Sequence, residues 1–242
     1  MKKQMKNSLF TINNPKTLKS KKVGYLEIIL HLAPHTISGY NTCSHSNKDC
    51  RSLCLVNSGH GGFTPNVMRA RIAKTKLFFE HNEYFLKRLN LEIYYYQLEA
   101  EKQGLKLLVR LNGTSDINWL NYKIDGKTLF EIHKNLTFVD YTKNLNFVSP
   151  FENYKIVYSI QRDTLKKGLK LLSEGKTIAG VFTEVPSEYH GKEITIGDHH
   201  DAINLHDNKF LGLKYKKLTY KGVDNKEIIK NNKLILDENN RI

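Results

Sequence analysis

An alternation of short apolar runs with longer amphipathic segments is the feature that most constrains the fold of this chain. Two segments show helical spacing of apolar residues, from Thr64 to Phe79 and from Glu83 to Gln103. Strands separated by helices form right-handed crossovers within a parallel sheet. We therefore expect an α/β fold whose parallel strands and crossover helices make a full or partial (β/α) barrel, with a doubly wound sheet as the alternative. The runs rich in β-branched and large apolar residues predict strands at 23–30, 105–111, 136–142, 154–160, 177–182 and 210–215.

Helix boundaries are suggested by capping residues. Thr64 offers a side-chain oxygen before Pro65, and Asp125 and Asp163 are predicted to cap two later helices. Gly104 is expected to end the helix that starts near Glu83.

The domain organisation follows from length and composition. The chain has 242 residues, 40% of them hydrophobic, which is enough for a substantial core. No internal repeat or low-complexity linker divides it, so we expect one α/β domain over residues 23–216. Residues 1–22 carry seven lysines with little apolar periodicity and predict a flexible basic arm. Residues 217–242 predict a polar C-terminal extension.

Charge and hydropathy narrow the class of protein. No run of eighteen apolar residues occurs, and the N-terminus lacks the apolar core of a secretory signal, so we expect an intracellular protein without a membrane partner. The formal net charge of +14 favours association with polyanions, which makes nucleic acid a possible partner through the basic surface. An AT-rich genome, which favours Lys, Asn and Ile at permissive positions, is the alternative explanation of that charge.

All three cysteines of the chain, Cys43, Cys50 and Cys54, lie within twelve residues. In a reducing compartment clustered thiols are typical of metal ligands, and an odd number leaves any disulfide scheme with a spare thiol. The spacing C-x6-C-x3-C indicates three ligands to one centre with a fourth position open, which favours an iron–sulfur cluster. Zinc, completed by His45, His60 or a distant residue, is the alternative, as are three unrelated thiols.

Polar residues follow several of the predicted strands. Ligands of parallel α/β folds bind at the loops that leave the carboxyl ends of the strands. We expect the segment after the second strand to orient a small cofactor or ligand, and Asp198, His200 and Asp201 to supply acid–base groups. The alternative is that such residues only form turns and helix caps. The predicted cofactor-binding residues are Asn112, Gly113, Thr114, Ser115 and Asp116.

Two further sequence features predict specific contacts. Arg110 lies near the end of a predicted buried strand and requires a carboxylate, for which Asp116 and Asp140 are the candidates. The glycines of HGGF, at 60–63, would let the backbone approach a ligand at the start of the helix from Thr64.

Several segments taken in order resemble the phage family known as gene product eighty-eight, over about residues 24–216. The resemblance implies a phage or prophage context, and hence the cytoplasm of the host cell, with little information about chemistry. Relatives tend to have a proline after the first cysteine and an arginine after the His-Asp pair, where this chain has Ser44 and Asn204. The matching segments are TCSHSNKDCRSLCL, GFTPNVMRARIAKT, VRLNGTSDINW, FVDYTKN, VFTEVPSEYHGKEITIGDHHDAINLHD and GLKYK.

A fainter resemblance is to radical S-adenosylmethionine enzymes, which place three cysteines, usually as C-x3-C-x2-C, after the first strand of a partial α/β barrel. The cysteine loop and the Asn112-Gly113-Thr114 segment hold the corresponding positions here, although the cysteine spacing differs. This resemblance implies S-adenosylmethionine as a cofactor, cleaved reductively at the open iron. Our leading hypothesis is an iron–sulfur enzyme acting on a small-molecule or nucleotide substrate. The alternative is a zinc-stabilised nucleic-acid-binding or host-interaction protein without catalysis.

Overall fold

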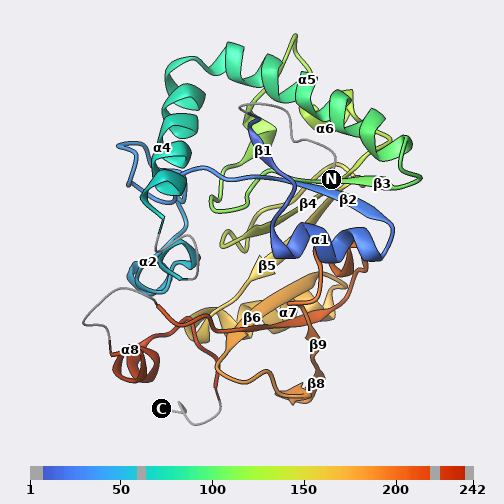
Figure 1. Ribbon diagram of the computed structural model, residues 1–242. Coiled ribbons are helices and arrows are strands. Elements are labelled where there is room, and N and C mark those ends of the chain that lie inside the picture. Colours follow the sequence, from blue (N-terminus) through green and yellow to red (C-terminus); the bar gives the residue numbers. More distant parts are fainter. Residues whose placement is uncertain (1–7, 59–63, 219–223, 238–242) are drawn as a thin grey trace.

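A computed structural model describes residues 8–58, 64–218 and 224–237 (Figure 1). An eight-stranded sheet has the order β1-β2-β3-β4-β5-β6-β10-β9, and all neighbouring strands are parallel except β1, which is antiparallel to β2. Its strands are β1 (Phe10–Thr11), β2 (Tyr25–Leu30), β3 (Lys106–Arg110), β4 (Thr137–Thr142), β5 (Tyr154–Ser159), β6 (Thr177–Phe182), β9 (Thr195–Ile196) and β10 (Phe210–Lys214). A separate antiparallel pair comprises β7 (Glu188–Tyr189) and β8 (Lys192–Glu193).

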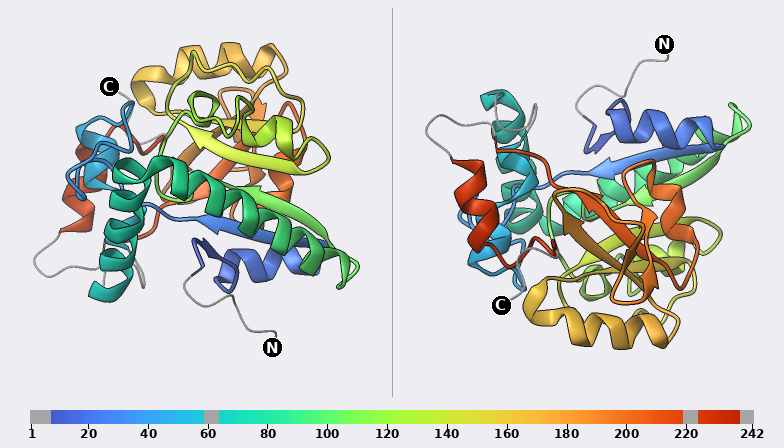
Figure 2. Two further views of the ribbon diagram at one scale, coloured as in Figure 1. Left: turned by 90° about the horizontal axis from the view of Figure 1, so that it is seen from above. Right: turned by 90° about the horizontal axis from the view of Figure 1, so that it is seen from below.

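The helices are close to those predicted from apolar spacing. Figures 1 and 2 show α5 lying along the sheet and α4 standing at the carboxyl ends of its strands. The α-helices are α1 (Pro15–Lys22), α2 (Lys48–Ser52), α4 (Pro65–Glu80), α5 (Asn82–Glu101), α6 (Leu129–Ile132), α7 (Leu165–Ser173) and α8 (Asn225–Asn231). The 3-10 turns are η1 (Leu55–Asn57), η2 (Trp119–Asn121), η3 (Arg162–Thr164) and η4 (Asp201–Leu205). Among the described residues, no helix is both long and apolar enough to span a membrane.

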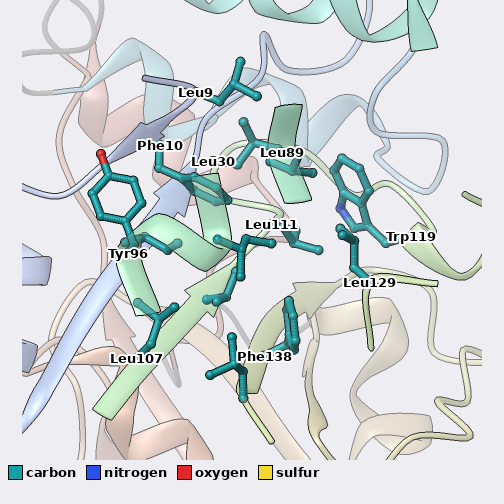
Figure 3. Packing of buried hydrophobic residues seen from close by; sticks show 14 of the residues in the cluster. Leu9, Phe10, Leu30, Leu89, Tyr96, Leu107, Leu111, Trp119, Leu129 and Phe138 are labelled. Atoms are coloured by element: carbon teal, nitrogen blue, oxygen red, sulfur yellow. The ribbon is translucent and has the colours of Figure 1, made fainter. Parts of the chain in front are cut away.

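One face of the sheet, called here the α5 face, carries the main hydrophobic core. Alternate residues of β2, β3 and β4 point to this face, where α5 and α6 cover them (Figure 3). The core continues under α7, where Leu172 packs with side chains of β5, β6 and β10. The crossover helices α5, α6 and α7 therefore lie on the same side of the sheet. The buried residues labelled in Figure 3 are Leu9, Phe10, Leu30, Leu89, Tyr96, Leu107, Leu111, Trp119, Leu129 and Phe138.

The opposite face, called the α1 face, is covered by α1 and η4. It carries the intervening residues of the same strands, including Leu108, Val139 and Val157, which pack with Ala202 of η4. Lys16 and Ser20 of α1 reach polar groups on this face. The α1 face is therefore partly apolar and partly charged, while the α5 face is almost wholly apolar.

The predicted α/β architecture with a mostly parallel sheet is confirmed. The parallel strands β2 to β6 stand side by side in chain order, and β10 follows β6. Within the described ranges the sheet is open, with β1 and β9 at its two edges, so these strands do not close a full barrel.

The predicted flexible arm, residues 1–22, contains β1 and α1 in its described part. Leu9 and Phe10 are buried in the core, and Asn14 forms a capping box with Thr17 at the start of α1. The lysine content concealed these elements, because contacts with residues distant in the chain, such as Glu92 and Asp201, hold the segment in place. Residues 217–242 likewise contain α8, and Ile235 and Leu236 are fully buried.

Two predicted helix caps were wrong, and a third helix starts where predicted but lacks the expected side-chain capping bond. Asp125 lies in a turn with a positive φ of 48°, and Thr128 caps α6 through a capping box with Glu131. Asp163 lies inside η3, which precedes α7. α4 begins at Pro65 as predicted, but Thr64 makes no side-chain capping bond.

Candidate functional site

The cysteine loop leaves the carboxyl end of β2. Cys43 precedes α2, Cys50 lies in α2, and Cys54 follows it at the start of η1. The side chain of Asn47 caps α2 by accepting a hydrogen bond from the backbone N–H of Cys50 at 2.9 Å. Cys50 is therefore held within this capped turn, whereas Cys54 lies two residues beyond its last residue, Ser52.

The three thiols are free, partly buried and close enough to interact electrostatically. Cys54 interacts with both Cys50 and Cys43, and Cys43 interacts with Cys50. Burial raises the pKa of all three thiols, that of Cys54 to about 11. In the described part of the chain, no group of three or more His, Cys, Asp or Glu side chains is arranged to hold a metal ion. His60 and the HGGF glycines lie outside the described residues.

The cysteine loop packs directly on the segment that follows β3. The Cys43 sulfur accepts a hydrogen bond from the His35 N–H at 3.3 Å and lies 4.0 Å from the Thr114 carbonyl oxygen. The Asp116 N–H donates to the Thr42 carbonyl at 2.8 Å. These contacts bring the predicted metal ligands beside the predicted cofactor-binding segment.

The C-terminal extension holds the same loop from the other side. The Asn232 side-chain amide donates to the Asp49 carbonyl at 3.1 Å and to the Ser52 hydroxyl at 2.8 Å. Leu53 packs with Leu218 and other apolar residues of the C-terminal extension. The position of α2 therefore depends on residues more than 160 positions further along the chain.

The side chains of the predicted cofactor-binding segment mainly stabilise its own loop. The Asn112 side-chain carbonyl accepts hydrogen bonds from the Ser115 hydroxyl at 2.8 Å and the Trp119 indole at 3.2 Å. The Thr114 hydroxyl donates to the Leu32 carbonyl at 2.6 Å, and an Asp116 carboxylate oxygen accepts from the Lys143 N–H at 2.9 Å. A direct role of these residues with a cofactor stays a prediction.

Gly113 allows close packing between the ends of β2 and β3. A Cβ atom there would lie 2.5 Å from Ile29 Cγ2, 2.6 Å from His31 Nδ1 and 2.7 Å from the Leu30 carbonyl oxygen. The Gly113 N–H also donates to that same carbonyl, so the backbone cannot move away without losing the bond.

We expect Gly113→Ala to lower the free energy of unfolding by about 1 to 3 kcal/mol, because overpacking against a backbone atom cannot be relieved by a side-chain rotation. Denaturant unfolding of both proteins measures the difference. Ser115→Ala removes one hydrogen bond from the same loop without adding volume, and is expected to cost about 1 kcal/mol or less. Equal stability of Gly113→Ala and the natural protein would contradict the packing argument.

A small cavity of about 40 Å³ adjoins this loop, and Asn112, Asp116, Asp140 and Tyr154 are among its lining residues. That volume holds about three water molecules. Asp140 is buried, and its carboxylate accepts hydrogen bonds from the Asn112 N–H at 2.6 Å and the Tyr154 hydroxyl at 3.0 Å. Burial raises the pKa of Asp140 to about 7, although these donors oppose the shift. Asp140 is therefore a candidate acid–base group at neutral pH.

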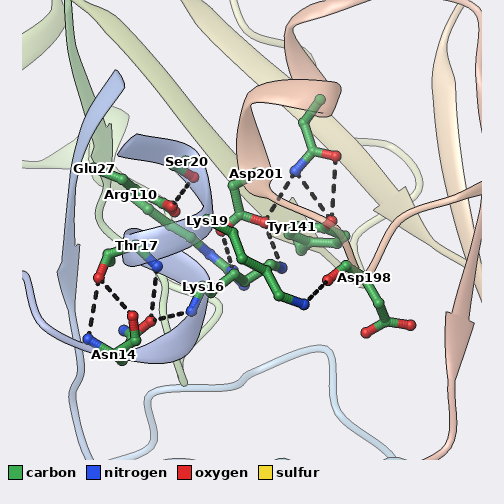
Figure 4. Close-up of polar contacts among 11 residues, drawn as sticks. Asn14, Lys16, Thr17, Lys19, Ser20, Glu27, Arg110, Tyr141, Asp198 and Asp201 are labelled. Atoms are coloured by element: carbon green, nitrogen blue, oxygen red, sulfur yellow. Dashed lines mark hydrogen bonds and ion pairs between the residues drawn. The ribbon is translucent and has the colours of Figure 1, made fainter. Parts of the chain in front are cut away.

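A second polar cluster lies on the α1 face (Figure 4). Asp201, at the start of η4, is fully buried and forms ion pairs with Arg110 of β3, at 2.8 Å, and with Lys16 of α1. Arg110 also stacks over the ring of Tyr141, with 4.8 Å between the guanidinium carbon and the ring centroid. Burial would raise the pKa of Asp201, but the two cations outweigh it and lower that pKa. The partner of Arg110 is thus Asp201, and the expected pairing with Asp116 or Asp140 is wrong.

Glu27, in the middle of β2, is a fully buried carboxyl group in the same cluster. Its Oε2 accepts a hydrogen bond from the Ser20 hydroxyl at 2.5 Å, its Oε1 has no hydrogen-bond partner among the described residues, and its carboxyl group interacts electrostatically with that of Asp201. Two neighbouring buried carboxyl groups do not readily ionise together, and the cations beside Asp201 favour the negative charge on Asp201. Burial and Asp201 together raise the pKa of Glu27 to about 8.

The structure separates the three predicted acid–base residues. Only Asp201 belongs to the buried cluster. Asp198 accepts a hydrogen bond from the Lys214 N–H through its carboxylate at 2.6 Å, and one from the Lys19 ammonium through its carbonyl at 3.2 Å. Burial lowers the pKa of His200, whose Nδ1 is buried without a hydrogen-bond partner among the described residues. A joint catalytic role for the three stays a prediction.

Several residues of these clusters were not singled out from the sequence as functional candidates. Glu27 and Asp140 are single acidic residues inside predicted apolar strands, and that placement is itself a signal, because buried carboxylates are rare unless they are paired. Lys16 carried no such signal, since it lies among many other lysines.

The fold and the site define a class: an α/β protein with a parallel sheet, a tri-cysteine loop at the carboxyl edge, and buried charge on the opposite face from the crossover helices. Residues 6–231 match the family described as gene product 88, so the chain belongs to the gene product 88 family. No curated protein and no solved structure matched the chain.

Proposed function

We propose that this gene product 88 protein binds an iron–sulfur cluster through Cys43, Cys50 and Cys54 and uses it in a reaction on a small ligand held at the carboxyl edge of the sheet. The observation that supports the proposal is that three free thiols of one loop interact electrostatically with one another, at the edge where parallel α/β folds bind ligands. Among the described residues the thiols do not form a ready-made metal site.

The type of donor fits such a cluster. Three soft thiolate ligands suit iron–sulfur clusters or zinc, and three ligands leave one position for a substrate or cofactor. Cationic groups lie near the thiols and would balance thiolate charge: Lys143 and Arg51 interact with Cys50, and Arg71 interacts with Cys54. The same donors bound to zinc are the alternative occupant.

The arrangement of the strands supports the finer proposal of a partial barrel. Parallel strands in chain order whose crossover α-helices α5, α6 and α7 lie on one face are typical of a singly wound sheet, as in a partial barrel. S-adenosylmethionine is the cofactor that this proposal implies. When bound, the cluster would supply an electron to the ligand at its open iron.

The protein's own part would be to position and enclose the ligand. The Thr114 carbonyl lies beside Cys43, and Asp116 anchors the neighbouring loop to Lys143 and Thr42. Asp140 lies in the wall of the adjoining cavity and could exchange a proton there near neutral pH.

Anaerobic purification tests the proposal. We expect a brown protein that absorbs near roughly 400 nm and contains roughly four irons per chain, and we expect Cys43→Ala, Cys50→Ala and Cys54→Ala each to lose most of the iron. Ser44→Ala, next to the first cysteine, should keep the natural iron content. A colourless protein with one zinc per chain, or with no metal, would exclude the cluster.

A further inference from the structure

Two buried nitrogen atoms near the cysteine loop have no hydrogen-bond partner among the described residues. They are Nδ1 of His31, the residue after β2, and Nη1 of Arg71 on α4. A buried donor without a partner costs about 1 to 3 kcal/mol, and more when it carries charge. Native structures rarely keep such donors unless an additional group satisfies them.

The packing of α4 brings Arg71 to the end of β2. The Thr75 hydroxyl accepts a hydrogen bond from the Ala33 N–H at 2.8 Å and donates to the Arg71 carbonyl at 2.8 Å. Arg71 lies one turn before Thr75, and residues four apart share a helix face, so Arg71 also faces the segment after β2. His31 is on that segment, and its Nδ1 lies so close to Gly113 that a Cβ atom on Gly113 would be 2.6 Å from it.

The charges around this position are mostly positive. Arg71, Lys74 and Arg110 act on His31, and together with burial they lower its pKa well below the usual range, so the imidazole is neutral. Lys74 is held by the Leu9 carbonyl, at 2.9 Å. The Cys54 thiol is the group of opposite sign that acts on Arg71. Three cationic side chains therefore act on His31 against one carboxylate, that of Asp201.

We propose that Arg71 and His31 form a binding site for an anionic group, a carboxylate or a phosphate, at the carboxyl end of β2 beside the cysteine loop. Arg71 would donate through Nη1, and the neutral imidazole would donate in the tautomer that carries its proton on Nδ1. The identification of this anion as part of the substrate or cofactor rests on the proposed function, but the binding of the anion does not.

Isothermal titration of the full-length protein with inorganic phosphate and, separately, with acetate tests the site. We expect saturable binding of phosphate, of acetate or of both. The anion that binds more tightly indicates whether a phosphate or a carboxylate is the natural group. Arg71→Gln should weaken the binding of that anion about tenfold or more, since a charge-assisted hydrogen bond is lost. Arg69→Gln is the matched control, because Arg69 is an exposed residue on the same helix, bonded to Asn66.

Two results would overturn the inference: no binding by the natural protein, or equal weakening in Arg69→Gln and Arg71→Gln, which would indicate general attraction to a basic surface. If Arg71→Gln does not fold, His31→Gln serves in its place, and the same weakening is expected. Iron is measured on each sample. Anion binding without iron would support this site and exclude the cluster, whereas iron without anion binding would exclude only this site.

Discussion

Asp201→Ala is expected to lower the free energy of unfolding by about 3 kcal/mol, because it leaves the buried guanidinium of Arg110 without its carboxylate. This loss of stability should lie at the lower end of the range for broken buried ion pairs. Glu27 is in contact with Asp201, and once Asp201 is gone Glu27 can ionise and partly replace it. Lys16 is partly exposed and can turn toward water. Denaturant unfolding at neutral pH measures the change.

Asp207→Ala, six residues further along the chain, shows by comparison how much stability is lost when an exposed aspartate is removed. Asp207 is largely exposed and pairs with Lys155 at 3.2 Å, so its loss should cost less than about 1 kcal/mol. If the two substitutions prove equally mild, Arg110 does not depend on Asp201, and the buried cluster contributes little to stability.

The second large effect concerns pH. The pKa of Glu27 rises from 4.5 in the unfolded chain to about 8 in the folded protein, so between these values the folded state holds a proton that the unfolded state has released. The resulting stabilisation is complete below pH 4.5 and is lost as the pH rises to about 8. At about 1.4 kcal/mol per unit, the loss is on the order of 5 kcal/mol over the whole range.

Other buried groups change the total curve. Asp140 acts in the same direction up to about pH 7, while His31 and His133, whose pKa values are lowered by burial, make stability rise with pH until about 6.5. The contribution of Glu27 to the pH dependence is therefore isolated by comparison with Glu27→Gln, because the glutamine side chain does not titrate.

We expect Glu27→Gln to gain stability relative to the natural protein as the pH rises from 4.5 to 8, as measured by urea unfolding at several pH values. Glu83→Gln is the control, since Glu83 is an exposed partner of Lys87, and its unfolding should follow the pH dependence of the natural protein. A constant difference between Glu27→Gln and the natural protein across this range would show that folding does not raise the pKa of Glu27.

Much of the fold could be predicted from the sequence because its signals are local. The run TIAGVF predicts β6 with its observed bounds, Thr177–Phe182, and the apolar spacing after Thr64 predicts α4. Caps were less predictable, since Asp125 and Thr128 are both suitable capping residues and only the turn conformation selects Thr128. The lysine-rich segment before residue 23 concealed α1, because its contacts are with residues distant in the chain.

The sequence by itself determined the parallel α/β architecture and the place of the cysteine loop, because strand and helix preferences and the order of elements are properties of neighbouring residues. Only the tertiary structure decided the charge pairing: Asp201 lies 91 residues after the Arg110 that it neutralises, and Asn232 lies 183 residues after the Asp49 carbonyl that it binds. Burial makes such pairing decisive, since a charge removed from water must take whichever partner the fold brings within reach.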